Sequence, residues 1–259
     1  MLKFFEEPMP SFFLSRMRFP LALFLIWLGL EPALAAPCVD LRWERRSYSV
    51  CRFDPKIDDL RLFWRAPDGE PLGSFAAAAA TLHPGEKLIF AMNAGMYDTG
   101  HAPVGLYIEK GVELRRANTR GGPGNFHLKP NGVFFIGAGQ AGVMETSHFL
   151  SQRPMAEYAT QSGPMLVNNG RIHPRIHADG VSAKIRNGVG VDREGQAVFA
   201  IANEPVTFYE FASLFREALH CENALFLDGS ISALYAPNLG RSDFTMPMGP
   251  MVGVVAKGP

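Results

Sequence analysis

Short apolar runs separated by turn-forming residues recur along the chain and predict a fold rich in β-strands. The run from Lys87 to Asn93 (KLIFAMN) indicates a buried strand that ends at Asn93. Paired apolar runs flanking glycine-containing turns predict hairpins. We expect them in residues 104–116 with a turn at Lys110-Gly111, 132–145 with a turn through Gly139, 164–173 with a turn at Asn169-Gly170, and 188–202. Asn-Gly is the strongest short hairpin signal among these.

One clear helix is predicted over residues 207–219. Its apolar residues follow the i, i+3, i+4, i+7 spacing of a helix face: Phe208, Phe211, Ala212, Phe215, Ala218 and Leu219. Thr207 and Glu210 provide a capping box at its start. Residues 74–82 (SFAAAAATL) are a weaker helix candidate.

The helix lies between two apolar runs, 197–202 and 224–228, and we therefore expect a right-handed crossover between parallel neighbouring strands. The predicted fold class is mixed α/β (α+β), with a large twisted mixed sheet, few helices and at least one parallel crossover. The chain has 259 residues, of which 47% are hydrophobic, enough for one large domain.

The charges balance, with 25 basic and 25 acidic residues, so the sequence gives no electrostatic footprint for nucleic acid or an anionic membrane. Residues 1–36 resemble a secretory signal: Arg16 and Arg18 precede an apolar stretch (21–30), followed by Ala33-Leu34-Ala35. We expect cleavage near Ala35 or Ala36, a mature domain over 37–259 that is periplasmic or secreted, and no stable membrane insertion afterwards. A lipid anchor on Cys38 is the alternative, but Pro37 stands where a small residue should precede the modified cysteine.

An exported chain would meet an oxidising compartment, which makes its three cysteines informative. Cys38 and Cys51 flank a segment that could form a short hairpin, and we expect a disulfide between them. The alternative is that all three cysteines are unpaired core residues. Cys221 lies between the predicted helix and a buried strand and is a poor candidate for a nucleophile.

Polar side chains follow or precede several strands at positions that border glycine. Asp228 comes directly after the apolar run 224–227 and is followed by Gly229, Ser230 and Ser232. A carboxylate at the carboxyl end of a strand is held by rigid backbone and can face a crevice. The structural alternative is that Asp228 caps its own turn.

Four further stretches carry amide, hydroxyl and charged groups next to strands. They contribute Asn93, Gly95, Tyr97 and Asp98; Asn125, His127, Lys129 and Asn131; Gln161 and Ser162; and Arg186 and Asn187. Together they predict one polar cleft. Arginine, lysine and exposed backbone amides suit a phosphate, whereas amides, hydroxyls and a carboxylate suit sugar hydroxyls.

These motifs resemble a known family. The stretches NAGMYD, GNFHLKPNGVFF, QSGPMLV, IRNGVGV and FYEFASLFREALHCENALFLDGSIS, with the Cys38/Cys51 pair, are similar to the phosphodiester glycosidase domain of uncovering enzymes, closest to its bacterial exported branch. The resemblance covers roughly residues 38–255. It implies a mixed α/β fold with a large twisted sheet and hydrolysis of a sugar-1-phosphodiester. It also implies that six positions line the pocket: Asn93, Gly95, Arg186, Asp228, Gly229 and Ser230.

Two departures from the eukaryotic pattern concern the pocket. Ser230-Ile231-Ser232 follows Gly229 where eukaryotic members continue a run of glycines, and Ala94 stands where they have a second glycine. We expect a more crowded pocket as a result. No cofactor or metal is expected, because Pro174 between His173 and His177 disfavours a metal-binding helix.

Asp228 is the expected nucleophile or base, with Arg186 neutralising the phosphate. Asp98 is the second candidate carboxylate and Glu204 the third, while His127 is interpreted as a structural histidine. The expected partner is a sugar phosphodiester or glycan. Two alternatives stay open: a hydrolase of another bond class on the same scaffold, and a non-catalytic glycan-binding protein.

Overall fold

The computed structural model describes residues 1–3, 36–244 and 246–258. The predicted signal segment therefore falls almost entirely outside the described residues. Residues 36–259 form one compact unit, and all that follows concerns this unit. Within the part of the chain that is described, no helix combines the length and apolar character needed to cross a membrane.

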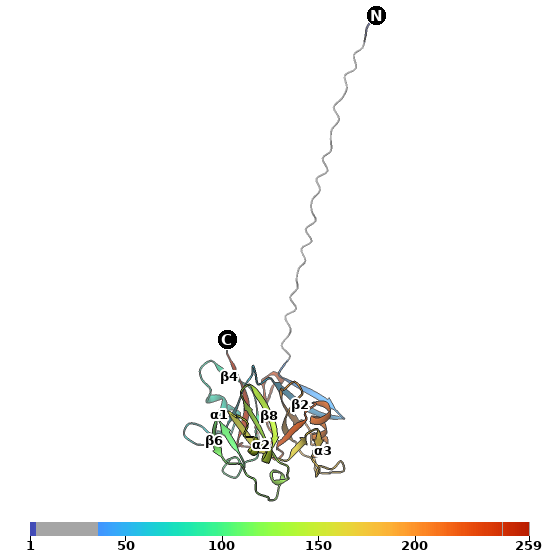
Figure 1. Cartoon of the computed structure of the whole chain (residues 1–259). Helices are drawn as coiled ribbons and strands as arrows, with labels where there is room; N and C mark the ends of the chain where they lie inside the picture. The colour runs from blue at the N-terminus through green and yellow to red at the C-terminus, as the bar shows by residue number, and fades with distance from the viewer. Residues whose placement is uncertain (4–35, 245, 259) are drawn as a thin grey trace. The chain divides into compact units, whose positions relative to one another are not determined.

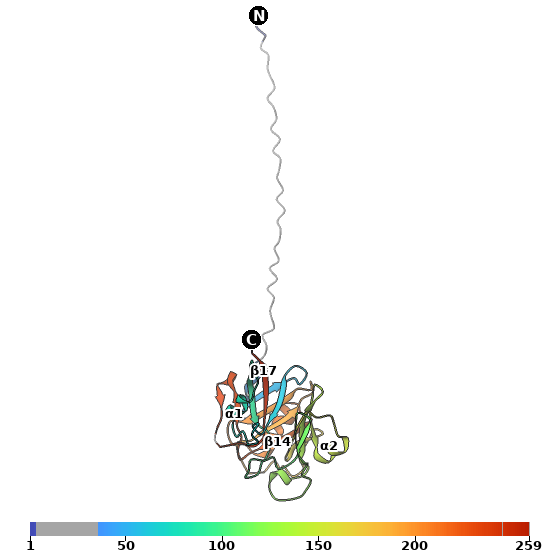
Figure 2. The same ribbon diagram turned by 90° about the vertical axis from the view of Figure 1, so that its left-hand side faces the viewer.

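Three antiparallel sheets make up the domain (Figures 1 and 2). The largest has the order β1 (Cys38–Trp43), β2 (Arg46–Phe53), β13 (Ala197–Ala202), β12 (Asn187–Val191), β14 (Asn223–Asp228), β10 (Met165–Asn168), β11 (Arg171–Ile172). The second has the order β16 (Arg241–Ser242), β15 (Leu234–Ala236), β4 (Glu86–Asn93), β17 (Met251–Lys257), β3 (Asp59–Phe63). The third has the order β6 (Val112–Arg115), β5 (Tyr107–Glu109), β9 (Tyr158–Ser162), β7 (Gly132–Gly137), β8 (Gln140–Glu145).

The helical elements are short and lie at the periphery of the strands. They are α1 (Phe75–Ala80), α2 (Thr146–Gln152), α3 (Phe208–Ser213), the π-helical turn η2 (Leu214–Ala218), and the 3₁₀ turns η1 (Asn125–His127) and η3 (Pro237–Leu239). Figure 1 shows α1 and α3 on opposite sides of the domain, and Figure 2 shows α1 and α2 on either side of the strands around β14. The predicted strand-rich fold with few helices is confirmed.

The predicted hairpins are all present, and in two of them the turn residues adopt the backbone conformation that two-residue turns require. Lys110 and Gly111 have φ of 52° and 76°, and Asn169 and Gly170 have φ of 49° and 71°. Two consecutive residues with positive φ match the right-handed twist of the flanking strands. The hairpins β5–β6 and β10–β11 follow from these local signals.

A helical segment is present where residues 207–219 predict one, with the capping box between Thr207 and Glu210, but only α3 is α-helical and the second half is the π-helical turn η2. Phe211, Phe215 and Leu219 are buried against the large sheet. The predicted crossover between parallel neighbours is wrong. β13 and β14 are not adjacent, because β12 lies between them and pairs antiparallel with both.

One aromatic cluster joins the three sheets. Phe90 of β4 lies 4.8 Å from Phe53 of β2 and 4.9 Å from Phe199 of β13, measured between ring centroids. Phe134 of β7 packs edge-on against Phe199 at 5.6 Å. Aromatic pairs at these distances add to the stabilisation from burying their area. The sheets therefore share one core, and the loops at their ends are held in fixed relation to one another.

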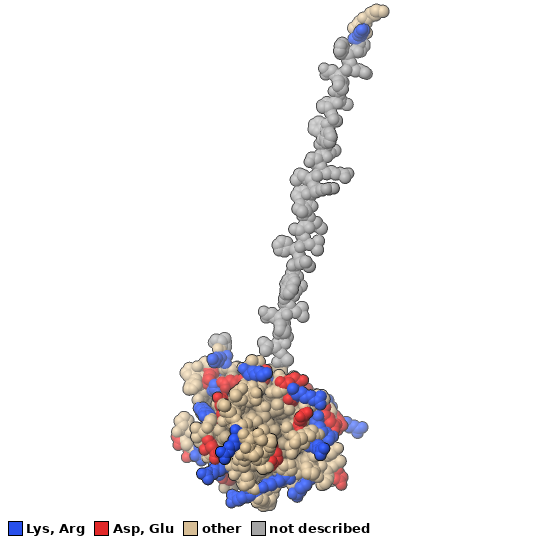
Figure 3. Space-filling model, in the orientation of Figure 1, with Lys and Arg blue, Asp and Glu red and all other residues tan. Residues whose placement is uncertain are grey.

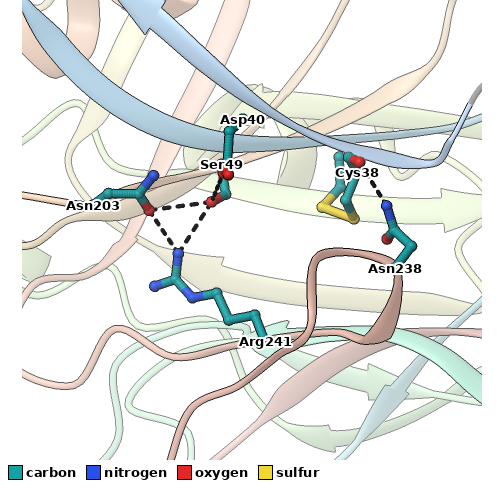
Figure 4. Close-up of a disulfide and its surroundings, with 7 residues drawn as sticks. Cys38, Asp40, Ser49, Asn203, Asn238 and Arg241 are labelled. Atoms are coloured by element: carbon teal, nitrogen blue, oxygen red, sulfur yellow. Dashed lines mark hydrogen bonds between the residues drawn. A yellow bond between two sulfur atoms is a disulfide. The ribbon is translucent and has the colours of Figure 1, made fainter.

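The predicted disulfide is confirmed. Cys38 and Cys51 are directly opposed across the β1–β2 hairpin, with their Cα atoms 4.0 Å apart. Figure 4 shows Asn238 donating a hydrogen bond to the Cys38 carbonyl, at 2.7 Å. In the same view Arg241 donates to Asn203 Oδ1 at 2.6 Å, which fastens the β15–β16 region to the large sheet. Cys221 is a buried free cysteine, and burial raises the pKa of its thiol to about 12.

Candidate functional site

A cleft of about 670 Å³ opens where loops from all three sheets meet. Its walls come from the segment after β4, the segment before β7, the turn after β14 and the segment before β17. The lining residues are Met96, Tyr97, Asp98, Thr99, His101, Val104, Pro123, Gly124, Asn125, Phe126, His127, Asp228, Ser230, Ile231, Met246 and Pro247. Of the residues expected at the site, Tyr97, Asp98, Asp228, Ser230 and Asn125 line this cleft.

Asp228 lies at the end of β14 and is 7% exposed. Its Oδ1 accepts hydrogen bonds from the backbone amides of Gly229 at 2.6 Å and Ser230 at 2.8 Å. Burial raises the pKa of this carboxyl, and the turn amides together with the nearby charge of Lys184 oppose the rise. Asp228 thus caps its own turn and faces the cleft at once, so the two roles considered from the sequence do not exclude each other.

A pair of buried asparagines holds the Asp228 turn in place. Asn187 Oδ1 accepts the amide hydrogen of Asp228 at 2.9 Å, and Asn187 Nδ2 donates to Asn93 Oδ1 at 2.9 Å. Asn93 Oδ1 also accepts from the Ala233 amide at 2.9 Å, so the pair spans both ends of the turn. Both asparagine side chains are fully buried and neither lines the cleft. Their geometry is that of positioning residues behind Asp228.

Arg186 also lies behind the cleft wall. Its guanidinium is 1% exposed, donates to the carbonyls of Val206 at 3.0 Å and Ser182 at 2.7 Å, and stacks 3.6 Å from the Phe208 ring centroid. No ion pair among the described residues includes Arg186. Burial lowers its pKa to about 10, which leaves it cationic at neutral pH.

Gly229, the glycine of the Asp228 turn, brings the turn backbone close to Arg186. A Cβ atom on Gly229 would lie 3.6 Å from a terminal nitrogen of Arg186 and 2.9 Å from the Phe226 ring. Only a glycine lets the backbone come this close to the ring without displacing it. A terminal nitrogen of the guanidinium therefore lies close to the backbone of Gly229.

Tyr97, Asp98 and His101 form another part of the cleft lining. The Tyr97 hydroxyl donates to the Pro247 carbonyl at 3.0 Å, and its ring stacks on His101 at 5.5 Å. Tyr97 and Asp228 line the same cleft. Burial, and to a smaller extent the charge of Asp228, raises the pKa of Tyr97. Asp98 Oδ1 accepts from the amides of Gly100 at 2.9 Å and Ala102 at 3.0 Å, so it orders its own loop.

The remaining expected residues lie outside the cleft lining. Gly95 has φ of 152°, and a Cβ atom there would lie 3.1 Å from Thr160 Oγ1, so the close approach of β4 to β9 requires glycine. Ser162 donates to the Leu227 carbonyl at 2.9 Å, and Ser232 donates to the Asp228 carbonyl at 3.0 Å. Asn131 donates to the Phe126 carbonyl at 3.0 Å. These side chains fasten the loops that build the cleft.

Lys129 and Gln161 belong to another feature next to the cleft. The exposed Lys129 ammonium donates to the Thr119 carbonyl, and the buried Gln161 amide contacts Asn118. Glu204 lies away from the cleft, 3.6 Å from Arg46.

Sequence reasoning missed His101, Thr99 and the 246–247 wall, and it interpreted His127 as structural. His127 lines the cleft while its Nδ1 lies 3.1 Å from the Arg120 carbonyl. Residues 99–101 directly follow Asp98 in a glycine-containing turn, a signal that could have drawn attention to His101. Among residues 1–3, 36–244 and 246–258, no three His, Cys, Asp or Glu side chains lie close enough together to hold a metal ion.

Comparison with known proteins identifies the family. The phosphodiester glycosidase family matches over residues 86–254, which include the strands that carry Asn93, Asn187 and Asp228. The chain belongs to the phosphodiester glycosidase family. Uncharacterized protein YigE of Escherichia coli strain K12 is 37% identical over 213 residues, which is 82% of each chain.

Solved structures show the same fold. The catalytic domain of zebrafish N-acetylglucosamine-1-phosphodiester α-N-acetylglucosaminidase, auto-inhibited by its pro-peptide, matches with a TM-score of 0.59 at 17% identity, over 84% of this chain and 81% of that one. A protein from Burkholderia pseudomallei, named provisionally as exported, matches with a TM-score of 0.52 at 11% identity, over 81% and 74% of the two chains. The family membership is consistent with a hydrolase of phosphodiester-linked sugars.

Proposed function

We propose that this protein is an exported glycosidase that hydrolyses the glycosidic bond of a phosphodiester-linked sugar in envelope or extracellular glycan. Water supplies the oxygen that bonds to the anomeric carbon, and the bond between that carbon and the phosphate oxygen breaks. The products are the free sugar and a phosphate monoester. Family membership over residues 86–254 supports the reaction class.

The observation that carries the proposal is the buried carboxylate of Asp228 facing the cleft. A phosphate monoester departs readily as an anion, so a single carboxylate suffices and no strong general acid is required. A carboxylate whose pKa is raised by burial is a better base than an exposed one. Asp228 either attacks the anomeric carbon or deprotonates the attacking water, and the anomeric configuration of the first product distinguishes the two.

The positive charge of Arg186 next to the Asp228 turn supports the binding of a phosphate group in the cleft. Arg186 stays cationic and its terminal nitrogen lies near Gly229. Its charge would act through the turn on phosphate negative charge without direct contact, in a site of low dielectric constant. Asn93 and Asn187 would fix Asp228, while Tyr97, Ser230 and His127 would contact the sugar.

Side chains that line the cleft affect which sugar it can accept. Ser230 and Ile231 line the cleft where eukaryotic members of the family have glycines, so side chains occupy space there. Because these side chains leave less room for the sugar, we propose that the preferred sugar differs from N-acetylglucosamine. Export is supported by the Cys38–Cys51 disulfide, since such bonds persist in oxidising compartments. A secretory signal over residues 1–36 with maturation near Pro37 remains part of the proposal, as does the absence of nucleic-acid partners.

One observation favours a second candidate, a glycan-binding protein without turnover. Asp228 Oδ1 is engaged by two backbone amides of its own turn, as in a purely structural Asp turn. A panel of sugar-1-phosphodiesters, assayed with wild type and Asp228→Asn, separates these functions. Turnover by wild type and binding alone by Asp228→Asn supports the glycosidase, whereas binding without turnover by both supports the lectin-like protein.

Oxygen-18 water identifies the bond that breaks. If the glycosidic bond is hydrolysed, the label appears at the anomeric hydroxyl of the sugar and the phosphate monoester stays unlabelled. Label in the phosphate would mean attack at phosphorus, and the protein would then be a phosphodiesterase on this scaffold.

A further inference from the structure

A second concavity of about 540 Å³ adjoins the cleft and carries three arginines. It is lined by Val104, Leu114, Arg115, Arg116, Ala117, Asn118, Thr119 and Arg120. No acidic side chain is among these lining residues. We call this feature the arginine groove. Figure 3 shows Lys and Arg atoms along the lower edge of the domain, while charges of both signs are mixed elsewhere on that face.

The groove and the cleft are neighbours with shared walls. Val104 lines both. A terminal nitrogen of Arg115 lies 3.9 Å from Oδ2 of the cleft residue Asp98, and the Arg120 carbonyl lies 3.1 Å from Nδ1 of the cleft residue His127. A ligand bound at Asp228 that extends past Asp98 or His127 would therefore enter the groove.

Two of the three arginines have no acidic partner. Among the described residues, no carboxylate lies within 4.0 Å of a side-chain nitrogen of Arg116 or Arg120, and both residues are exposed. The chain is neutral overall, with 25 basic and 25 acidic residues. The excess of guanidinium groups in this groove is therefore local and not a consequence of general basicity.

The side-chain amide of the buried Gln161 holds the loop backbone next to these arginines through hydrogen bonds. Gln161 is 1% exposed; its Oε1 accepts from the Asn118 amide at 2.9 Å, and its Nε2 donates to the Asn118 carbonyl at 2.9 Å. Gln161 also binds the Leu106 amide at 3.0 Å and Thr146 Oγ1 at 3.2 Å, so every hydrogen-bonding position of its amide is used. Lys129 holds the adjacent Thr119 carbonyl. Because the backbone at Asn118 and Thr119 is already held, binding a ligand there requires little further ordering of the loop backbone.

We propose that the arginine groove binds a second phosphate of the substrate, on the far side of the scissile linkage from the sugar. Guanidinium groups match the oxygens of a phosphate with paired hydrogen bonds. The substrate class is then a chain with successive phosphodiester-linked units, and a single sugar phosphodiester is the minimal substrate only. This inference rests on the proposed function for the reaction and on the groove alone for the binding.

Binding is tested first, independently of turnover, with linear tripolyphosphate as the probe. The comparison is between wild type, Arg116→Gln/Arg120→Gln, and the matched control Arg42→Gln/Arg45→Gln, which removes two exposed arginines of the β1–β2 hairpin. At low ionic strength we expect the groove variant to bind about ten-fold or more weakly, because it loses two charge-assisted contacts. In wild type, the backbone amide NMR signals of Asn118 and Thr119 should shift on titration. Equal affinity in all three proteins, or shifts confined to other regions, would overturn the proposal.

Turnover is tested with two substrates that share one sugar and differ by one additional phosphodiester unit in the leaving group. Wild type should prefer the longer substrate in kcat/KM, and the groove variant should lose about ten-fold of that preference, whereas the control variant keeps it. An unchanged preference in the groove variant contradicts the inference. If tripolyphosphate binds as expected while neither substrate is hydrolysed, the proposed glycosidase activity fails and the anion-binding groove stands.

Discussion

Replacing Asn187 by alanine should destabilise the protein strongly, because this residue links β12, β4 and the Asp228 turn. The alanine variant leaves the buried amide of Asp228 without its partner at 2.9 Å, which costs about 1–3 kcal/mol. It also removes the bonds from Nδ2 to the carbonyl and side-chain oxygens of Asn93, each contributing about 0.5–1.5 kcal/mol net. The sum is a loss of about 2–6 kcal/mol in the free energy of unfolding.

The measurement is urea unfolding followed by circular dichroism, with Asn238→Ala as the matched control. Asn238 is exposed and donates one hydrogen bond, to the Cys38 carbonyl at 2.7 Å, so its removal should cost about 1 kcal/mol or less. For a domain of this size, each kcal/mol corresponds to about 2–4 °C in Tm, so the two variants should separate clearly on heating as well. Equal stability of the two variants would refute the inference that the buried asparagine pair supports the turn.

Three further outcomes follow from the packing, the disulfide and the buried carboxyl. Phe215 belongs to η2 and is fully buried against the large sheet, so Phe215→Ala should lower the free energy of unfolding by about 3–5 kcal/mol in urea titration. A cost no larger than that of Leu150→Ala, at an exposed position, would mean that this helix face is not a core face. Mass analysis after alkylation in denaturant should find one modifiable thiol before reduction, that of Cys221, and three after it; three thiols without reductant would contradict the bridge. Cys38→Ser/Cys51→Ser should lose about 3 kcal/mol of unfolding free energy. The folded-state pKa of Asp228 is raised above 3.8, so the native protein binds more protons than the unfolded chain between 3.8 and that raised value, and its stability falls as pH rises through this window. Asp228→Asn should therefore gain stability over wild type at pH 7 and lose that advantage at about pH 3; a pH-independent difference in urea titrations would contradict the burial of a charged form.

The sequence was most informative where the determining signal is local. The turns at Lys110-Gly111 and Asn169-Gly170 each depend on two residues with positive φ, which Asn and Gly adopt readily. The capping box at Thr207 and the apolar face of residues 207–219 are likewise written within one short segment. The disulfide is also a local feature, because Cys38 and Cys51 are only 13 residues apart in the sequence and flank one hairpin.

Strand order could not be predicted, because it depends on pairing between segments distant along the chain. The β12–β13 hairpin is local, but nothing in the sequence states that β14 pairs with the other edge of β12. The sequence therefore predicts that β13 and β14 are neighbours, whereas β12 lies between them in the sheet.

The same limit applies to the site. Sequence pattern placed Asp228, Tyr97, Asp98 and Ser230 at strand ends, and these residues line the cleft. A strand-end asparagine that faces a crevice and one that cross-links two buried strands have the same local sequence. Asn93 and Asn187 belong to the second kind. Arg186 lies against the Phe208 ring, and neither periodicity nor composition distinguishes such a buried arginine from one that faces the cleft.

The most direct test of the central claim is the turnover number of Asp228→Asn on a hydrolysed sugar-1-phosphodiester, compared with wild type and Asp98→Asn. Asp228 and Asp98 line the same cleft, so the second variant controls for the loss of a cleft charge. If Asp228 is the nucleophile or base, Asp228→Asn should lower kcat by about 10²–10⁴-fold or more while circular dichroism shows an intact fold. Asp98→Asn should lower kcat far less, since Asp98 orders its own loop through Gly100 and Ala102. Retained turnover in Asp228→Asn, or a larger loss in Asp98→Asn, would contradict the assignment of Asp228 as the catalytic carboxylate.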